Sequence, residues 1–203
     1  MSDLRRTVIP MMLLGDGQVG KTSLISRLTG KKFDDSPMTT IGKETYLYDT
    51  ILHDINIKIK IFDTAGQERF KSMSANVIKN VEGLILTYSI ASKESFNNLD
   101  NWLNQLNNVS DISKTPIILV GNKSDLKDLR EVDYEEGEDY AKEHDFHFFE
   151  TSAKTGENVK EAFDYIFELL YKKLEEEITG KKGYVKQVLV IKKNKEKKQK
   201  CCW

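Results

Sequence analysis

Short apolar runs alternate along this chain with segments in which apolar residues recur every three or four positions. Ile57, Ile59 and Ile61 are separated by lysines, and this alternation predicts a strand with one buried face and one wet face. This strand is expected to pair with residues 45–52 around a turn at His53 and Asp54. Further apolar runs predict strands over residues 11–14, 83–88, 116–120 and 146–149.

Between these runs, the spacing of apolar residues is typical of amphipathic helices. Leu24, Ile25 and Leu28 predict a first helix, and the stripe at positions 96, 99, 102, 103 and 106 predicts one over residues 92–108, with Phe96 and Trp102 in the core. A polar helix over residues 134–144 and a strongly apolar-striped last helix follow. Strands that alternate with helices predict an α/β fold, with a mainly parallel sheet covered by helices on both faces.

Particular residues are expected to set the ends of these elements. The first strand should begin at Pro10, because proline cannot donate to the ladder of a central strand. The first helix should end near Gly30. Ser92 is expected to cap the helix that follows it, and Asn158 with Glu161 to form a capping box for the last helix. The last helix is expected to end near residue 177.

Residues 15–22 match the pattern G-x-x-x-x-G-K-[ST], which is typical of a phosphate-binding loop. Its glycines let the backbone approach an anion closely, with its N–H groups turned inward. Lys21 provides a positive charge for the β- and γ-phosphates, and Thr22 provides a hydroxyl ligand for Mg²⁺. A chance glycine-rich turn would also fit the letters, but a predicted strand before the loop and a helix after it favour a nucleotide site.

The composition narrows the class of protein. With 203 residues, the chain is long enough for one α/β domain and too short for two of ordinary size. Residues 180–203 hold nine lysines and one acid, a charge of +8, whereas the remainder holds 22 basic and 31 acidic residues, a charge of −9. A mildly acidic body with a basic tail favours a membrane-surface anchor over binding to nucleic acid.

Other features argue against several kinds of site. The only cysteines, Cys201 and Cys202, are adjacent, so we expect no internal disulfide framework and no cysteine-based zinc site. The three histidines lack metal-ligand spacing, and no apolar run approaches the length of a transmembrane helix. The start of the chain imitates a signal peptide, but it leads directly into the glycine-rich loop without a cleavage site, and we expect a strand there.

A second motif, D-x-x-G, occupies residues 63–66 directly after the predicted strand that ends at Phe62. A carboxylate at a strand end can hold Mg²⁺ through one of the waters that this ion retains. Asp63 is therefore the candidate for that role.

Two more motifs complete the pattern. Residues 122–125 read N-K-S-D and residues 152–154 read S-A-K, each after a predicted strand. With these four motifs the chain resembles a small GTPase of the Ras superfamily and, within it, the Rab family. This resemblance implies the P-loop NTPase fold of a Ras-like G domain over residues 1–178, with a mostly parallel six-stranded sheet that has one antiparallel edge strand.

The resemblance also implies roles for individual residues. Asp125 would pair with the N1–H and amine of guanine, and Gln67 would orient the attacking water as the catalytic residue. Thr22, Thr40 and, through a water, Asp63 would hold Mg²⁺. The remaining residues expected to bind GTP or GDP are Gly17, Gln18, Val19, Gly20, Lys21, Ser23, Phe33, Gly66, Asn122, Lys123, Ser152, Ala153 and Lys154.

The implied activity is a slow hydrolysis of GTP to GDP and phosphate by a monomeric molecular switch. Residues 33–42 and 66–79 would be ordered by the γ-phosphate and Mg²⁺ and released after hydrolysis. The implied partners are an exchange factor, a GTPase-activating protein, a prenylation escort, a GDP-dissociation inhibitor and effectors. A binding-only module and a different P-loop class, such as an ATPase or a small-molecule kinase, remain as alternatives.

Some positions depart from the Rab pattern. Gln18 stands where Gly or Ala is usual, and we expect its backbone φ to be positive, a conformation that strains a residue other than glycine. Phe62 replaces the usual Trp, and Val77 with Ile78 replaces a tyrosine pair. These last departures fall on the effector surface of the family, so the sequence leaves the subfamily open.

The end of the chain is expected to be a flexible basic tail over residues 179–203. Its apolar segment, residues 188–191, is either a docking segment for the prenylation escort or a strand added to the domain. The final four residues do not form a C-a-a-X box, but they match the paired-cysteine endings that Rab proteins use for double geranylgeranylation. Cys201 and Cys202 are therefore the expected lipidation sites, and the expected location is the cytoplasmic face of endomembranes, with cycling to the cytosol.

Overall fold

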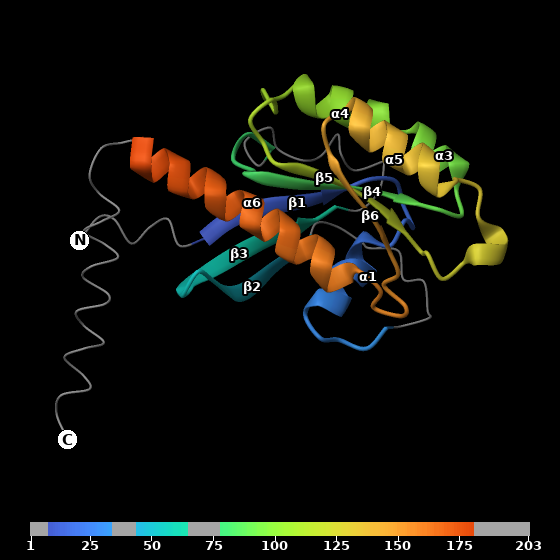
Figure 1. The fold of residues 1–203 in the computed structure, drawn as a ribbon, viewed down its shortest axis with the longest axis horizontal. Helices are drawn as coiled ribbons and strands as arrows, with labels where there is room; N and C mark the ends of the chain where they lie inside the picture. Colours follow the sequence, from blue (N-terminus) through green and yellow to red (C-terminus); the bar gives the residue numbers. More distant parts are fainter. Residues whose placement is uncertain (1–7, 34–43, 65–77, 181–203) are drawn as a thin grey trace.

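A computed structural model describes residues 8–33, 44–64 and 78–180 of this protein, with the side chains of residues 44 and 177–180 left aside. Within these ranges, six strands form one sheet in the order β2-β3-β1-β4-β5-β6. Among the described strand pairs, only β2–β3 at one edge is antiparallel and the other pairs are parallel, which confirms the predicted sheet (Figure 1). The strands are β1 (Val8–Leu14), β2 (Glu44–Leu52), β3 (Ile55–Asp63), β4 (Gly83–Ser89), β5 (Ile117–Asn122) and β6 (His147–Thr151).

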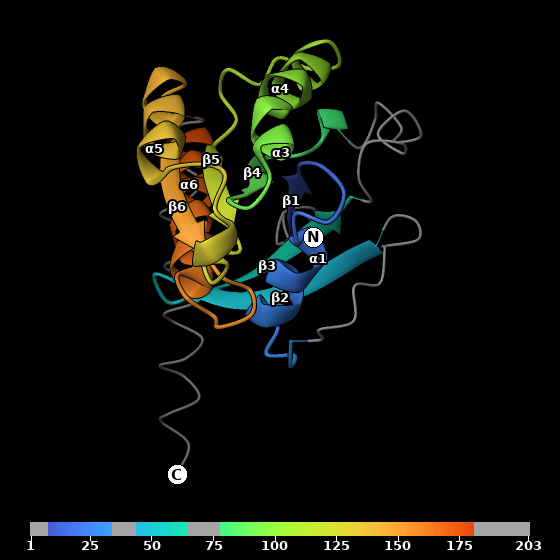
Figure 2. The same cartoon turned by 90° about the vertical axis from the view of Figure 1, so that its right-hand side faces the viewer.

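Helices cover both faces of this sheet (Figures 1 and 2). The helices are α1 (Lys21–Leu28), α3 (Lys93–Asn97), α4 (Leu99–Asn107), α5 (Tyr134–Glu143) and α6 (Val159–Gly180), with a short 3₁₀ helix at Lys127–Leu129. Apolar residues of α1 and α6 pack on one face, and those of α4 and α5 pack on the other. Because side chains alternate along a strand, β1 supplies both cores: Met11 and Leu13 face α1 and α6, whereas Met12 and Leu14 face α4.

Strand β1 begins at Val8, so the predicted start at Pro10 was two residues late. The carbonyl oxygen of Pro10 accepts a hydrogen bond from the N–H of Glu82 at 2.8 Å, on the side of β4. In a parallel ladder the N and the carbonyl of one residue face the same neighbour, so the missing N–H of Pro10 also faces this side. Pairing with β4 starts only at Met11, opposite Gly83, and no ladder bond is lost at Pro10.

The predicted end of the first helix is confirmed. Gly30 follows the last helical residues with φ 76°, which glycine adopts without strain. Its N–H donates to the carbonyl of Arg27, and the N–H of Lys31 donates to that of Ser26. This pair of bonds is a Schellman motif, which satisfies carbonyls that the helix leaves open.

The helix predicted over residues 92–108 divides into α3 and α4. Ser92 caps it as predicted, because its side-chain oxygen accepts the N–H of Ser95 at 3.2 Å. Asn98, at φ −82° and ψ −4°, separates the two short helices. The apolar spacing continues across this break, and for that reason the pattern alone predicted one helix.

The capping box predicted at Asn158 and Glu161 was wrong. Asn158 has a φ of 53° instead of the extended backbone of an N-cap residue, and its amide nitrogen donates to the carbonyl of Glu150 at 2.9 Å. Its side chain therefore fastens the start of α6 to strand β6. Helix α6 also continues to Gly180, three residues beyond the predicted end.

Candidate nucleotide-binding site

The predicted motifs meet at one edge of the sheet, where the parallel strands have their carboxyl ends. The loop of residues 15–20 follows β1, Asp63 ends β3, Asn122 ends β5 and Ser152 follows β6. This edge is where open α/β sheets bind ligands, since the loops that leave the strands converge there.

The backbone of residues 15–20 requires its glycines. Gly15 has a φ of 139° and Gly20 a φ of 97°. A Cβ atom at Gly15 would lie 1.9 Å from the carbonyl oxygen of Thr87, and one at Gly20 would lie 2.3 Å from Nδ2 of Asn122. The loop is thus pressed against β4 and β5, which leaves its other side for a ligand. Gln18 has the predicted positive φ, at 63°.

This value of φ allows a direct test of strain at Gln18. We expect Gln18→Gly to stabilise the protein by about 1 kcal/mol or less, because glycine adopts the left-handed conformation without a steric cost. Gln18→Ala is the matched control, since it keeps the strain and removes the rest of the side chain. Urea unfolding of the three proteins gives the comparison. Equal losses of stability in both variants would show instead that the Gln side chain makes stabilising contacts.

Lys21 is a buried cation at the first position of α1, with 5% of its surface exposed. Its Nζ donates to the carbonyl oxygens of Gly15 at 2.7 Å and Asp16 at 2.6 Å, which holds the side chain along the loop. Burial lowers the pKa of Lys21 to about 8, against the opposing effect of the carboxylates of Asp63 and Asp16. An anion bound beside this ammonium group would raise its pKa back toward the usual value, and the N-terminus of α1 would also favour that anion.

Thr22 and Asp63 bring two oxygen ligands together from α1 and β3. The hydroxyl of Thr22 donates to Oδ2 of Asp63 at 2.5 Å. Asp63 is fully buried, and the next residue, Thr64, donates its hydroxyl to the carbonyl of Leu13 at 2.8 Å, which ties this strand end to β1. A hydroxyl and a carboxylate in contact are the ligand chemistry that Mg²⁺ prefers, so these residues fit that ion.

Asn122 joins the phosphate loop to the loop after β6. Its Nδ2 donates to the carbonyl of Val19 at 2.8 Å, and its Oδ1 accepts from the hydroxyl of Thr151 and the N–H of Ala153, each at 3.2 Å. The side chain is 1% exposed, so these bonds are protected from water. The N–H of Ala153, in the motif that the resemblance implies for guanine binding, thus donates to Asn122 in this structure.

Asp125 and its neighbours form the second half of the site. The hydroxyl of Ser152 donates to Oδ1 of Asp125 at 2.5 Å, which orients the carboxylate. Lys123 has a φ of 70°, and partial burial lowers its pKa. Lys154 is exposed, and Phe33 packs partly buried against the core that includes α1.

Sequence reasoning missed the contacts of Asp16 and Arg27 that support the site. Asp16 accepts hydrogen bonds from Nε1 of Trp102 at 2.9 Å and Nδ2 of Asn98 at 2.7 Å, which fasten the phosphate loop to α4. Arg27 donates to the loop after β6. A tryptophan in an apolar stripe needs an acceptor for its N–H, and this requirement could have indicated a polar partner for Trp102.

Several predicted residues lie outside the part of the chain that the structure describes. They are Thr40, Gly66, Gln67, Cys201 and Cys202. Within the described part, no group of three or more His, Cys, Asp or Glu residues could hold a metal ion. Among the helices of that part, none has both the length and the apolar character needed to cross a membrane.

Comparisons with known proteins extend these observations. The model of the Ras family matches residues 10–172. Ras-related protein Rab-27B of Rattus norvegicus is 35% identical over 178 residues, which cover 83% of this chain and 82% of that protein. Ras-related protein Rab-27B of Bos taurus is 35% identical over 179 residues, with the same coverage of both chains.

Proposed function

Because this chain belongs to the Ras family and is a Rab-like small GTPase, we propose that its GTP-bound form recruits effectors in membrane trafficking and that hydrolysis of GTP to GDP and phosphate ends the recruitment. One observation supports the nucleotide-binding part of this proposal above the others. Asn122 hydrogen-bonds both to the phosphate loop at Val19 and to the loop of Ser152, whose hydroxyl orients Asp125. A phosphate-binding half and a base-reading half are thereby held as one site.

Each half has a distinct task in the proposed mechanism. The N–H groups of residues 17–23 and the ammonium of Lys21 bind the β- and γ-phosphates at the N-terminus of α1. Asp125 accepts the N1–H and amine of guanine, with the stems of Lys123 and Lys154 beside the base and Phe33 against it. Thr22, Asp63 through a water, and Thr40 would hold Mg²⁺, which supplies positive charge against the phosphates. Gln67 orients the attacking water.

The intrinsic rate is expected to be slow. The sequence offers no evident internal arginine for the transition state, and a GTPase without one turns over on the order of 10⁻⁴ s⁻¹. An activating partner would add the missing charge, and the exchange factor and GDP-dissociation inhibitor would act on the GDP-bound form.

Single-turnover hydrolysis tests this function. We expect Gln67→Leu to slow GTP hydrolysis by about tenfold or more and to leave GTP affinity unchanged, because only the positioning of water is lost. Gln105→Leu, the same chemical change at an exposed position of α4, is the matched control and should hydrolyse GTP at the wild-type rate. Equal rates for wild type and Gln67→Leu would favour the binding-only module, with Gln18 in the phosphate loop as the first residue to examine.

The tail is the proposed membrane anchor, with the G domain over residues 1–178 and the tail over residues 179–203. One lipid chain gives reversible attachment, and stable anchoring takes two signals. The first signal would be the geranylgeranyl groups on Cys201 and Cys202, which are added with the help of the prenylation escort. The second would be the lysines of the tail, which would bind the cytoplasmic face of endomembranes.

Fractionation of cells tests the anchor. We expect replacement of Cys201 and Cys202 by Ser to move the protein to the cytosol, because lysines alone bind weakly at physiological salt. Replacing Lys192 and Lys193 by Gln is the control that keeps both lipids, and it should loosen attachment without abolishing it. Membrane association that survives the loss of both cysteines would refute the lipid anchor.

A further inference from the structure

Arg27 links the two halves of the site through the body of α1. This helix begins at Lys21 in the phosphate half, and Arg27 lies six residues further, about 9 Å along the axis. Its Nε donates to the carbonyl of Ala153 at 2.8 Å, and its Nη2 donates to the carbonyl of Lys154. One guanidinium group thus holds two successive carbonyls of the loop that follows β6.

The bond from Arg27 to the carbonyl of Lys154 fixes the direction of the N–H group in the same peptide unit. In a trans peptide unit the carbonyl and the N–H point in opposite directions. Because Arg27 holds the carbonyl of Lys154, the N–H of Thr155 in the same unit is turned away from Arg27. That N–H donates to Oγ of Ser152 at 3.1 Å.

Ser152 then passes the orientation to the base-reading carboxylate. Its hydroxyl, which accepts the N–H of Thr155, donates its own proton to Oδ1 of Asp125 at 2.5 Å. A chain of donors and acceptors therefore runs from the guanidinium of Arg27, through one peptide unit and one hydroxyl, to Asp125. Each member is oriented by the one before it, since a hydroxyl that accepts from one side is set to donate on the other.

We propose that Arg27 is a positioning residue for guanine recognition, which holds Asp125 toward the purine amine through the Lys154–Thr155 peptide and Ser152. The inference rests on the proposed reading of guanine by Asp125. It adds that the helix which carries the phosphate-binding residues also sets the selectivity for the base. If Arg27 only stabilised the loop and had no part in the choice of base, it would make the same two hydrogen bonds. A loss of GDP affinity alone therefore does not test the proposal.

The test compares GDP with inosine diphosphate, which keeps the oxygen of guanine and lacks its amine. Displacement of a fluorescent nucleotide gives both affinities for wild type and for Arg27→Met, which keeps the length of the side chain and removes its donors. We expect GDP affinity to fall about tenfold and inosine diphosphate affinity to fall much less, so that the GDP preference drops by about threefold or more.

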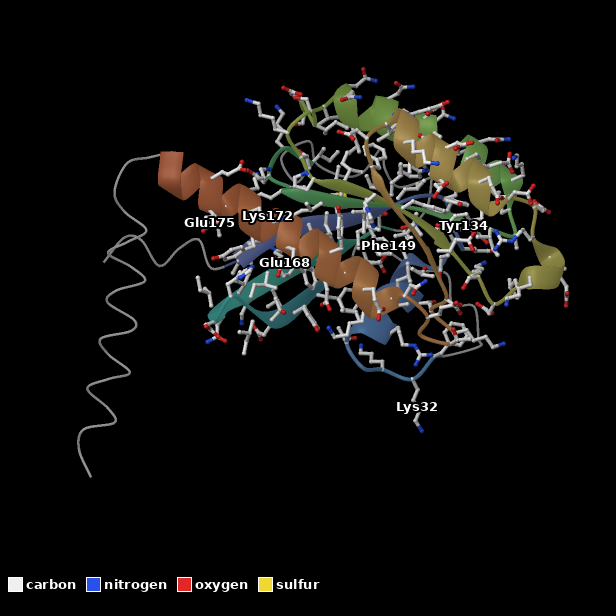
Figure 3. All side chains as sticks on the ribbon, viewed as in Figure 1. Lys32, Tyr134, Phe149, Glu168, Lys172 and Glu175 are labelled. Carbon is white, nitrogen blue, oxygen red and sulfur yellow. The ribbon has the colours of Figure 1, made fainter. Side chains whose placement is uncertain are left out.

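Two further variants separate this effect from others. Lys32→Met removes one positive charge from an exposed residue just past α1, whose side chain points away from the protein, and should change neither affinity (Figure 3). Arg27→Lys keeps the charge and offers a single donor group, and it should lie between wild type and Arg27→Met. It also provides the measurement if Arg27→Met fails to fold.

The route through Ser152 is tested by a double variant. In a Ser152→Ala background, Arg27→Met should leave the ratio of GDP to inosine diphosphate affinity unchanged, because the relay to Asp125 is already broken. Equal losses of both affinities in Arg27→Met, or no loss, would overturn the role of Arg27 while the guanine reading stands. A wild type without preference for GDP over inosine diphosphate and ADP would instead remove the guanine reading itself, and this proposal with it.

Discussion

Replacing Asp125 with Asn is expected to turn a guanine-selective site into one that prefers xanthine. Xanthine carries an oxygen where guanine carries its amine, and the amide nitrogen of Asn can donate to that oxygen. Ser152, which now donates to the carboxylate at 2.5 Å, can still donate to the amide oxygen, so the new side chain keeps its support. A site built to hydrogen-bond one group rejects an analogue that lacks it by large factors, and we expect GDP affinity to fall by a factor on the order of 100 or more.

Competition with a labelled nucleotide measures the affinities for GDP and xanthosine diphosphate in wild type and variant. Asp128→Asn, the same change at an exposed position three residues further, is the matched control and should keep the preference for GDP. An Asp125→Asn protein that still prefers GDP over xanthosine diphosphate would contradict the role of Asp125. Equal displacement by ATP and GTP in the wild type would favour a different P-loop class.

Gly15→Ala is expected to have the largest effect on stability. The added methyl group would lie 1.9 Å from the carbonyl oxygen of Thr87, a backbone atom of the buried strand β4, and a φ of 139° is unfavourable for alanine. Overpacking and backbone strain together should cost about 3 kcal/mol or more and displace the phosphate loop, so that nucleotide binding is lost.

Gly17→Ala is the matched control for this variant. Apart from Gly17 and its two chain neighbours, no heavy atom of the described residues lies within 4 Å of a Cβ atom at Gly17, and its φ is not in the left-handed region. Urea unfolding distinguishes the two variants by their free energies of unfolding. A Gly15→Ala protein with the stability of Gly17→Ala would show that the loop can move away from β4 at little cost.

The strands could be predicted because the buried positions of a strand recur at a regular spacing of apolar residues in the sequence. The alternation at Ile57, Ile59 and Ile61 is visible within a few residues, and the mostly parallel sheet with one antiparallel edge strand followed from the family resemblance. The ends at Gly30 and Ser92 could be predicted from residue type, but other ends depend on single contacts that the spacing of apolar residues does not show. The divide at Asn98 and the bond from Asn158 to the carbonyl of Glu150 are both of this kind.

The candidate site also has a part that the sequence predicts and a part that it does not. Its motifs are contiguous in the sequence, and the described members gathered at one edge of the sheet as expected. The contacts that support them join distant segments: Arg27 and Ala153 are 126 residues apart, and Asp16 and Trp102 are 86 apart. Such pairs form only when the chain has folded. The need of Trp102 for an acceptor can be inferred from the sequence, but the neighbours of either partner do not show which distant residue it will contact.

The bond between Trp102 and Asp16 has a practical consequence. Trp102 is a fully buried indole whose N–H donates to a carboxylate of the phosphate loop. Indole emission responds to hydrogen bonding and to nearby charge, so the intrinsic fluorescence of this protein carries a signal from the loop itself. Trp203 is the other tryptophan of the chain, and Trp203→Phe leaves Trp102 as a single built-in optical probe that needs no label.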